Sequence, residues 1–131
     1  MKFAYTILYV PDVLASLAFY EKAFGFQRGF VHELGTYGEL DTGHTTLAFA
    51  AHVLGEMHLT EGYVAADLSA KPLGMEVAFM TDDVPAAHQR ALSAGASQIK
   101  PPTTMPWNQV VSYVRCPDGS LVELCSPVAA G

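Results

Sequence analysis

Two glutamates lie in segments whose other residues are typical of β-strands. Glu123 belongs to the run LVELC, where alternating side chains place it between Leu121 and Cys125 on one face. An unpaired carboxylate is costly to bury among apolar side chains, so Glu123 needs a partner, contact with water or a function. Glu76 lies in a second strand-like run, MEVAFMT.

Glu76 and Glu123 are candidate catalytic residues. If the two carboxylates lie close together, their repulsion raises the pKa of one, and that group could then act as a general acid or base. Alternatively, each carboxylate has a structural role and accepts hydrogen bonds from a backbone amide, water or a tyrosine. Tyr5 is a candidate for that tyrosine, or for a ligand contact, or for a packed side chain.

A second group of candidate ligand-binding residues lies in the proline-rich run KPPTTMPWNQ. Trp107, the only tryptophan, could stack on a flat ligand or a cation at the mouth of a cavity. Met105 is adaptable in shape, and Asn108 and Gln109 could orient a polar edge of the same ligand. In the alternative interpretation, Trp107 covers the sheet or lies at a dimer interface.

The elements that must position these residues follow the order β-α-β-β-β twice. Asp12 and Asp83 are suitable N-caps for two helices, which Gly25 and Gly95 end. Strands are predicted near 3–10, 26–34, 36–42 and 44–51 in the first half, and near 75–81, 96–100, 109–115 and 121–126 in the second.

The two halves align as an internal repeat. Asp12 matches Asp83, 71 positions later, and the glycines that end the helices then agree within one residue. The alignment matches Tyr5 with Glu76, near the first strand of each half. It also matches Ala48 with Glu123, on the last strand of each half. If the sheets curl around a shared space, four side chains point into it, and Glu123 lines a cavity: Tyr5, Ala48, Glu76 and Glu123.

At this level of detail the chain resembles the vicinal oxygen chelate superfamily, which includes glyoxalases, bleomycin-resistance proteins and extradiol dioxygenases. The resemblance rests on YVPDVLASLAFYEKAFGF at 9–26, VAFMTDDVPAAHQRALSAGA at 77–96 and MPWNQVVSYVRCPDGSLVELCSP at 105–127. It implies an α+β fold of two tandem βαβββ modules that form a curved-sheet cleft or open barrel, as a homodimer.

The expected organisation is one glyoxalase-like domain over residues 1–131. Module 1 spans about 1–51, a linker about 52–74, and module 2 about 75–127. The linker is long for a structureless loop in a compact domain. A short helix, a lid and an arm over a partner subunit therefore remain open beside a plain connection.

The resemblance also indicates which residues of this chain would have to bind a metal. In the metalloenzymes of this superfamily the positions of Tyr5, Ala48, Glu76 and Glu123 supply the ligands, and only Glu123 matches the usual residue type. A nickel or zinc site needs three or four nitrogen, sulfur or carboxylate donors. We therefore expect no cofactor; the alternative is a divalent metal held weakly by Glu76 and Glu123.

The charge balance argues against several partners. Seven Lys and Arg against thirteen Asp and Glu give a net charge of -6 without a basic cluster, unlike a nucleic-acid-binding protein. No apolar run reaches the roughly 20 residues that a membrane span needs. The start of the chain, MKFA, lacks the layout of a signal peptide.

The turn signal CPDGS bears on the cysteines. If it pairs Cys116 with Leu121, Cys125 lies opposite Ser112, too far from Cys116 for a disulfide. Reduced thiols without an export signal predict a cytoplasmic protein.

The leading functional hypothesis is a metal-independent small-molecule binding protein of the bleomycin-resistance type. Trp107, Tyr5 and other aromatics would hold a planar or basic ligand, and the two glutamates would take its cationic group. The alternative is a divalent-metal-dependent lyase or isomerase resembling lactoylglutathione lyase. An extradiol dioxygenase is not expected, because its two-histidine, one-carboxylate pattern is absent. A third possibility is a structural module whose cavity is filled by its own side chains.

Overall fold

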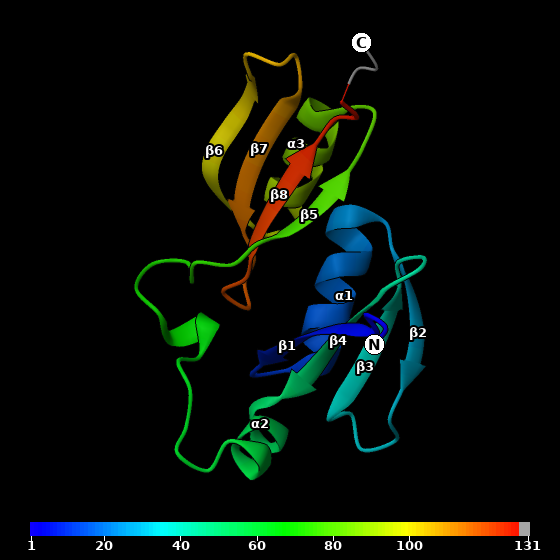
Figure 1. Ribbon diagram of the computed structural model, residues 1–131, viewed down its shortest axis with the longest axis vertical. Helices are drawn as coiled ribbons and strands as arrows, with labels where there is room; N and C mark the ends of the chain where they lie inside the picture. The colour runs from blue at the N-terminus through cyan, green and yellow to red at the C-terminus, as the bar shows by residue number, and fades with distance from the viewer. Residues whose placement is uncertain (129–131) are drawn as a thin grey trace.

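The structure, a computed structural model, describes residues 1–128; the last three residues of the predicted 1–131 domain lie outside them. Two βαβββ modules follow each other along the chain, joined by a segment that contains two short helices (Figure 1). Module 1 consists of β1 (Tyr5–Val10), α1 (Val13–Phe24), β2 (Gln27–Val31), β3 (Tyr37–Asp41) and β4 (Thr46–Ala51). The connecting segment holds α2 (His52–His58) and the 3-10 helix η1 (Ala66–Leu68). Module 2 consists of β5 (Val77–Met80), α3 (Val84–Ala94), β6 (Ser97–Thr104), β7 (Val110–Arg115) and β8 (Leu121–Cys125).

The two main helices begin and end at the residues that the sequence indicates. The Asp12 carboxylate accepts a hydrogen bond from the Ala15 amide, and Asp83 does the same for Ala86, both at 3.0 Å. Gly25 ends α1 in the left-handed conformation at φ 78°, where a side chain would be strained. Neither these helices nor any other within residues 1–128 is long and apolar enough to cross a membrane.

Each module contributes one four-stranded sheet, in the orders β1-β4-β3-β2 and β5-β8-β7-β6. In both sheets the first strand runs parallel to the last, and the other pairs are antiparallel. Ile7 pairs with Ala48, and Ala78, 71 positions after Ile7, pairs with Glu123. The strand register therefore confirms the repeat, and with it the α+β fold of two tandem modules; the sheets stay open and form no closed barrel.

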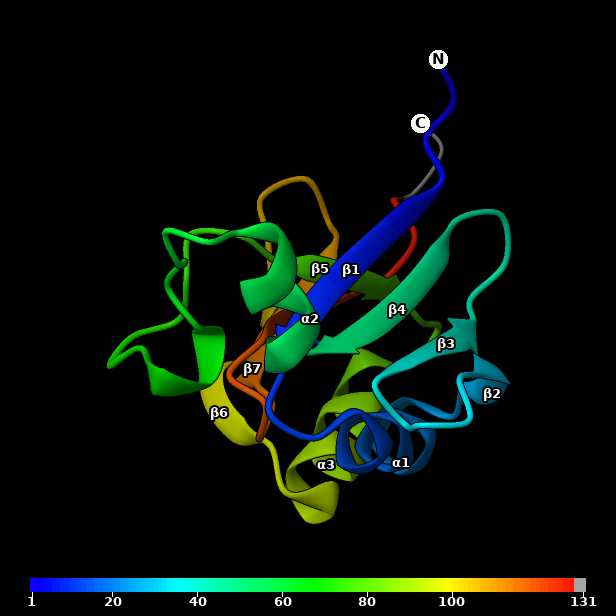
Figure 2. The ribbon, with the colours of Figure 1, turned by 90° about the horizontal axis from the view of Figure 1, so that it is seen from below.

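Both modules bury the same face of their sheet. Helices α1 and α3 lie side by side and cover one face of the strands (Figure 2). Phe79 of β5 joins the two cores, because its ring lies 5.0 Å from that of Phe24 and 4.7 Å from that of Phe26. Val122 and Leu124 of β8 are buried in the same core.

The opposite side of the strands is called the open face here. Along β1 the odd-numbered residues lie on it, and Tyr5 and Ile7 keep 53% and 45% of their surface exposed. In module 2, Met80 on the same side is 66% exposed. Since strand side chains alternate, Glu123 also lies on the open face, between Val122 and Leu124, which are buried on the other face.

The turn between β7 and β8 differs from the sequence prediction by one residue. Arg115, not Cys116, pairs with Leu121, so Cys125 lies opposite Val111 rather than Ser112. The cause is a three-residue loop: Gly119 donates to the Cys116 carbonyl at 2.8 Å and adopts φ 90°. Both cysteines are nevertheless free, as predicted.

A buried histidine fastens α3 to its sheet. His88 is 4% exposed, and its Nε2 lies 2.8 Å from the carbonyl oxygen of the Gln98 side chain. Because that oxygen only accepts, Nε2 carries the proton, and Nδ1 accepts from the Ser112 hydroxyl at 2.9 Å. Both ring nitrogens are thus paired within the structure.

His88→Leu should lower the free energy of unfolding by about 1–3 kcal/mol, because it leaves the buried Ser112 hydroxyl without its partner. Urea denaturation followed by circular dichroism measures this loss. Gln89→Leu on the exposed side of the same helix is the control and should change little. Equal stability of the two variants would show that the buried hydrogen bonds contribute nothing.

Candidate functional site

Glu76 and Glu123 come together on the open face of module 2. Glu76 directly precedes β5, and its neighbour Val77 pairs with Val122 of β8, next to Glu123. The two carboxyl groups lie within hydrogen-bonding reach of each other. The Tyr113 hydroxyl, from the opposing position on β7, donates to Glu123 Oε1 at 2.8 Å.

The two carboxyl groups affect each other's proton. Partial desolvation, together with hydrogen bonding to and repulsion by Glu123, raises the pKa of Glu76 from 4.5 to about 7. The hydrogen bond to Glu123, followed by desolvation, raises the pKa of Tyr113 to about 12, so its phenol stays a donor. Near neutral pH Glu76 is therefore protonated for part of the time, and it can donate or accept a proton.

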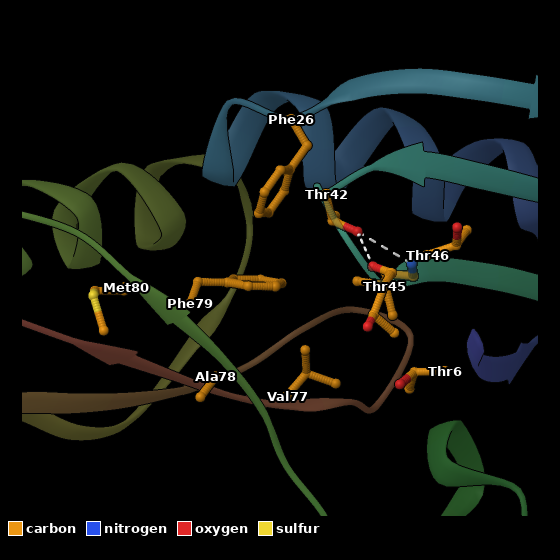
Figure 3. A pocket seen from close by; sticks show the side chains of 10 residues that line it. Thr6, Phe26, Thr42, Thr45, Thr46, Val77, Ala78, Phe79 and Met80 are labelled. Carbon is orange, nitrogen blue, oxygen red and sulfur yellow. Dashed lines mark hydrogen bonds between the residues drawn. The ribbon is translucent and has the colours of Figure 1, made fainter. Parts of the chain in front are cut away.

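Among the described residues, two cavities are lined by both β1 and β5. The larger, called the cleft here, has a volume of about 370 Å³ and lies between the modules (Figure 3). Threonines form much of one side of it, and apolar side chains of β5 and Phe26 the other. The smaller, called the recess, has a volume of about 100 Å³ and includes Glu76 in its wall. Thr6 and Val77 line both cavities, which are therefore neighbours along β1 and β5.

Tyr5 and Glu123 each lie one strand away from a residue of the cleft. Tyr5 pairs with Thr46, and Glu123 pairs with Ala78; both partners line the cleft. Register partners lie side by side on one face, so Tyr5 and Glu123 lie near the cleft without lining it.

Module 1 has a tyrosine–glutamate pair, Tyr37 and Glu39, where module 2 has the two carboxylates Glu76 and Glu123. The Tyr37 hydroxyl donates to Glu39 Oε2 at 2.7 Å, and desolvation and this bond raise the pKa of Tyr37. Tyr5 lies near enough to contribute to that shift. Ala48, between β1 and β3, is fully buried, so as folded here its side chain offers no surface to a ligand.

The predicted ligand-binding loop forms the turn between β6 and β7. The Asn108 amide donates to the Met105 carbonyl at 2.9 Å, and Asn108 adopts a left-handed φ of 68°. Trp107, 54% exposed, donates through Nε1 to the side chain of Gln109, which donates to the Ser126 carbonyl. The structure thus groups these residues at one end of the sheet, and none of them lines the cleft or the recess.

The segment 52–74 is anchored to both modules. Within the segment, His52 lies between Tyr63 and Asp67: Nε2 donates to Asp67 Oδ1 at 2.8 Å, and Nδ1 lies 2.6 Å from the Tyr63 hydroxyl. The Tyr63 ring packs 5.2 Å from that of Tyr9 on the open face. The beginning of the segment therefore folds back over β1.

On module 2, Arg115 holds the segment through backbone carbonyls. Its Nη2 donates to the carbonyls of Ala66 and Ser69, both at 2.8 Å, and its Nε to Gly119 at 3.2 Å. Sequence reasoning missed both Tyr113 and Arg115. A prediction with a hairpin loop one residue shorter would have placed Tyr113 opposite Glu123. Arg115 could not have been found in this way, because it binds backbone carbonyls that no sequence motif marks.

A divalent metal, which the fold family implies, does not fit these residues. Within residues 1–128, no three His, Cys, Asp or Glu side chains gather where they could hold an ion. Glu76 and Glu123 supply two carboxylates, whereas Tyr5 offers a phenol, a poor ligand unless ionised, and Ala48 has no donor atom in its side chain. Two oxygen donors of this kind fall short of a catalytic nickel or zinc site.

Comparison with known families agrees with this architecture. A sequence profile of the Glyoxalase/Bleomycin resistance protein/Dioxygenase superfamily matches residues 2–124. The chain belongs to this superfamily. It is also 30% identical over 123 residues to YwbC, an uncharacterized protein of Bacillus subtilis (strain 168), covering 91% of this chain and 92% of YwbC.

Solved structures of the glyoxalase superfamily share the fold. A glyoxalase/bleomycin resistance protein/dioxygenase family enzyme from Burkholderia phytofirmans PsJN gives a TM-score of 0.81 at 24% identity, covering 98% of this chain and 100% of that chain. A glyoxalase-related enzyme from Fulvimarina pelagi gives a TM-score of 0.81 at 22% identity, covering 97% of this chain and 88% of that chain. At these identities the likeness shows the fold alone.

Glu123→Gln should lower the pKa of Glu76 from about 7 toward 4.5, because the substitution removes the neighbouring charge. NMR titration of the glutamate side-chain carboxyl carbons measures the change. Glu39→Gln, which removes a carboxylate from the same face of module 1, should leave the titration of Glu76 as it is. A Glu76 pKa near 4.5 in the unmodified protein would contradict the coupling.

The raised pKa of Glu76 also makes the stability of the folded protein depend on pH. The pKa of Glu76 is raised in the folded state. The contribution of Glu76 to the stability of the fold is therefore fully present below about pH 4.5 and is lost as pH rises through about 7. Melting temperature should therefore fall more between pH 5 and pH 8 in the unmodified protein than in Glu76→Gln. Parallel melting curves for the two proteins would contradict this.

Proposed function

We propose that this protein binds a small molecule without a metal, in the manner of the bleomycin-resistance branch of its superfamily. The single observation that carries the proposal is the Glu76–Glu123 pair beside the cleft, at positions where metalloenzymes of the superfamily have metal ligands. Here the two carboxyl groups interact with each other and with Tyr113 instead.

The charge of the pair favours a basic ligand. At neutral pH Glu76 is charged for part of the time, and both glutamates face the open side of the sheet. A protonated nitrogen placed between them would gain charge-assisted hydrogen bonds and relieve the repulsion of the two carboxylates. Tyr5 beside Thr46 adds an aromatic surface on the other side of the cleft for a planar part of the ligand.

A lyase or isomerase of the glyoxalase type receives less support. Such an enzyme uses a metal to polarise a carbonyl or enediolate while a carboxylate moves a proton. The carboxylate pair could supply the proton transfer, but the donor set for the metal is incomplete.

Proflavine, a planar cation, should bind the protein, and Glu123→Gln should weaken this binding at least about tenfold, as expected for the loss of a charge-assisted contact. Dye fluorescence measures the affinity. Glu39→Gln serves as the matched control and should bind like the unmodified protein. Equal affinity of Glu123→Gln, or equally tight binding of anionic fluorescein, would refute the role of the pair.

The proposal includes a homodimer in the cytoplasm. The open face exposes Tyr5, Ile7 and Met80, and large apolar groups gathered on one side of a sheet are typical of protein interfaces. Two buried, reduced cysteines suit the reducing cytoplasm.

Light scattering should therefore give about twice the chain mass of 14.1 kDa. Ile7→Glu should reduce the mass to that of one chain, because it places a charge in the interface. Leu14→Glu, at a similarly exposed position on α1, should leave the dimer intact. A monomer in the unmodified protein would overturn this part of the proposal.

A further inference from the structure

The recess beside Glu76 is apolar along most of its wall. Leu8 of β1, Val77 of β5 and Leu121 of β8 line it from the strands, and Leu73 and Met75 line it from the end of the connecting segment. The recess therefore differs from the threonine-rich cleft in what it can accept: a group inside it would contact mainly hydrocarbon.

The recess is held open by backbone contacts, not by loosely packed side chains. Arg115 binds the carbonyls of Ala66 and Ser69 and so fixes the segment that forms the outer wall. Gly119 lies directly against Ala66, since a Cβ at this position would come 2.3 Å from the Ala66 carbonyl oxygen. Both Ala66 and Gly119 line the recess.

The size of the recess limits its occupant. A cavity of 150 Å³ in another protein accommodates benzene, so a volume of about 100 Å³ corresponds to about four carbon atoms. An unbranched chain of about that length would fill the enclosed part of the recess.

Glu76 connects the recess with the carboxylate pair, because it lines the one and belongs to the other. We propose that the recess binds a short, unbranched alkyl chain attached to an amine, whose protonated nitrogen lies on Glu76 and Glu123. This inference rests on the proposed function of the pair and narrows its ligand class to alkylamines with about four carbons next to the nitrogen.

The alkyl chain and the ammonium group of such a ligand contribute separately to its binding affinity. Each methylene transferred from water into the recess should lower the dissociation constant about fourfold, until the recess is full. The ammonium group should contribute a constant factor, independent of chain length, because it stays at the carboxylates.

The test is an NMR titration of the full-length protein with the series from methylamine to hexylamine, followed through backbone amides that include Gly119. The dissociation constant should fall about 60-fold from methylamine to butylamine and change less than about twofold from butylamine to hexylamine. Butanol, which lacks the charge, should bind more weakly than butylamine.

Paired substitutions at Leu73 test the recess directly. Leu73→Ala should enlarge it and move the limit to longer chains, while Leu73→Phe should fill it and end the gain at ethylamine. Opposite shifts in two variants cannot come from a general loss of folding. Unchanged chain-length dependence in both variants would overturn the assignment.

The outcomes separate the two proposals. If all amines bind equally well and Glu123→Gln weakens each of them, the recess assignment is wrong and the carboxylate pair still binds the cation. If butanol binds as tightly as butylamine and Glu123→Gln has no effect, both the amine class and the function proposed for the pair are wrong.

Discussion

Packing of α1 and α3 on the same side of the strands is the constraint on which the site depends. Each helix buries one face of its own sheet, and the two helices pack against each other, so both sheets leave the same side uncovered. Strand alternation then sends every second side chain of β1, β5 and β8 to that side. A carboxylate at these positions avoids the cost of a dry core, which is how Glu123 can lie between Val122 and Leu124.

On that open face the two modules have diverged. Both present a tyrosine hydroxyl that donates to a glutamate, Tyr37 to Glu39 and Tyr113 to Glu123. Only module 2 brings a second carboxyl group, Glu76, next to the first. Desolvation, with hydrogen bonding to and repulsion by Glu123, raises the pKa of Glu76 to about 7, so the two halves of a symmetric frame differ in charge chemistry.

Much of this arrangement could be predicted from the sequence, because it follows from local patterns. Capping residues and glycines give the helices, and the 71-residue repeat equates Tyr5 with Glu76 before any coordinates are known. The meeting of Glu76 and Glu123 follows from the same repeat. Sequence patterns also suggested Trp107 as a ligand contact; in the structure its Nε1 donates to Gln109 at the end of a hairpin, and the suggested role stays a prediction.

The features that could not be predicted depend on register and on backbone contacts between distant segments. A strand register wrong by one residue changes the face of every side chain, and the Pro-Asp-Gly loop is one residue shorter than its sequence suggests. This is why Tyr113 was missed as the partner of Glu123. Arg115 binds carbonyl groups more than forty residues away, at 66 and 69, and carbonyls carry no sequence signature.

Metal content tests the central claim most directly, since the account requires a carboxylate pair that works without an ion. The protein, after gel filtration, would be analysed by mass spectrometry, and its melting temperature measured in excess Ni, Co, Zn, Mn and Mg. The account predicts less than about a tenth of an equivalent of metal and a melting shift below about 1 °C, small against the change that 1 kcal/mol of binding would cause. Near-stoichiometric metal that Glu123→Gln removes would contradict it and would make the pair part of a metal centre.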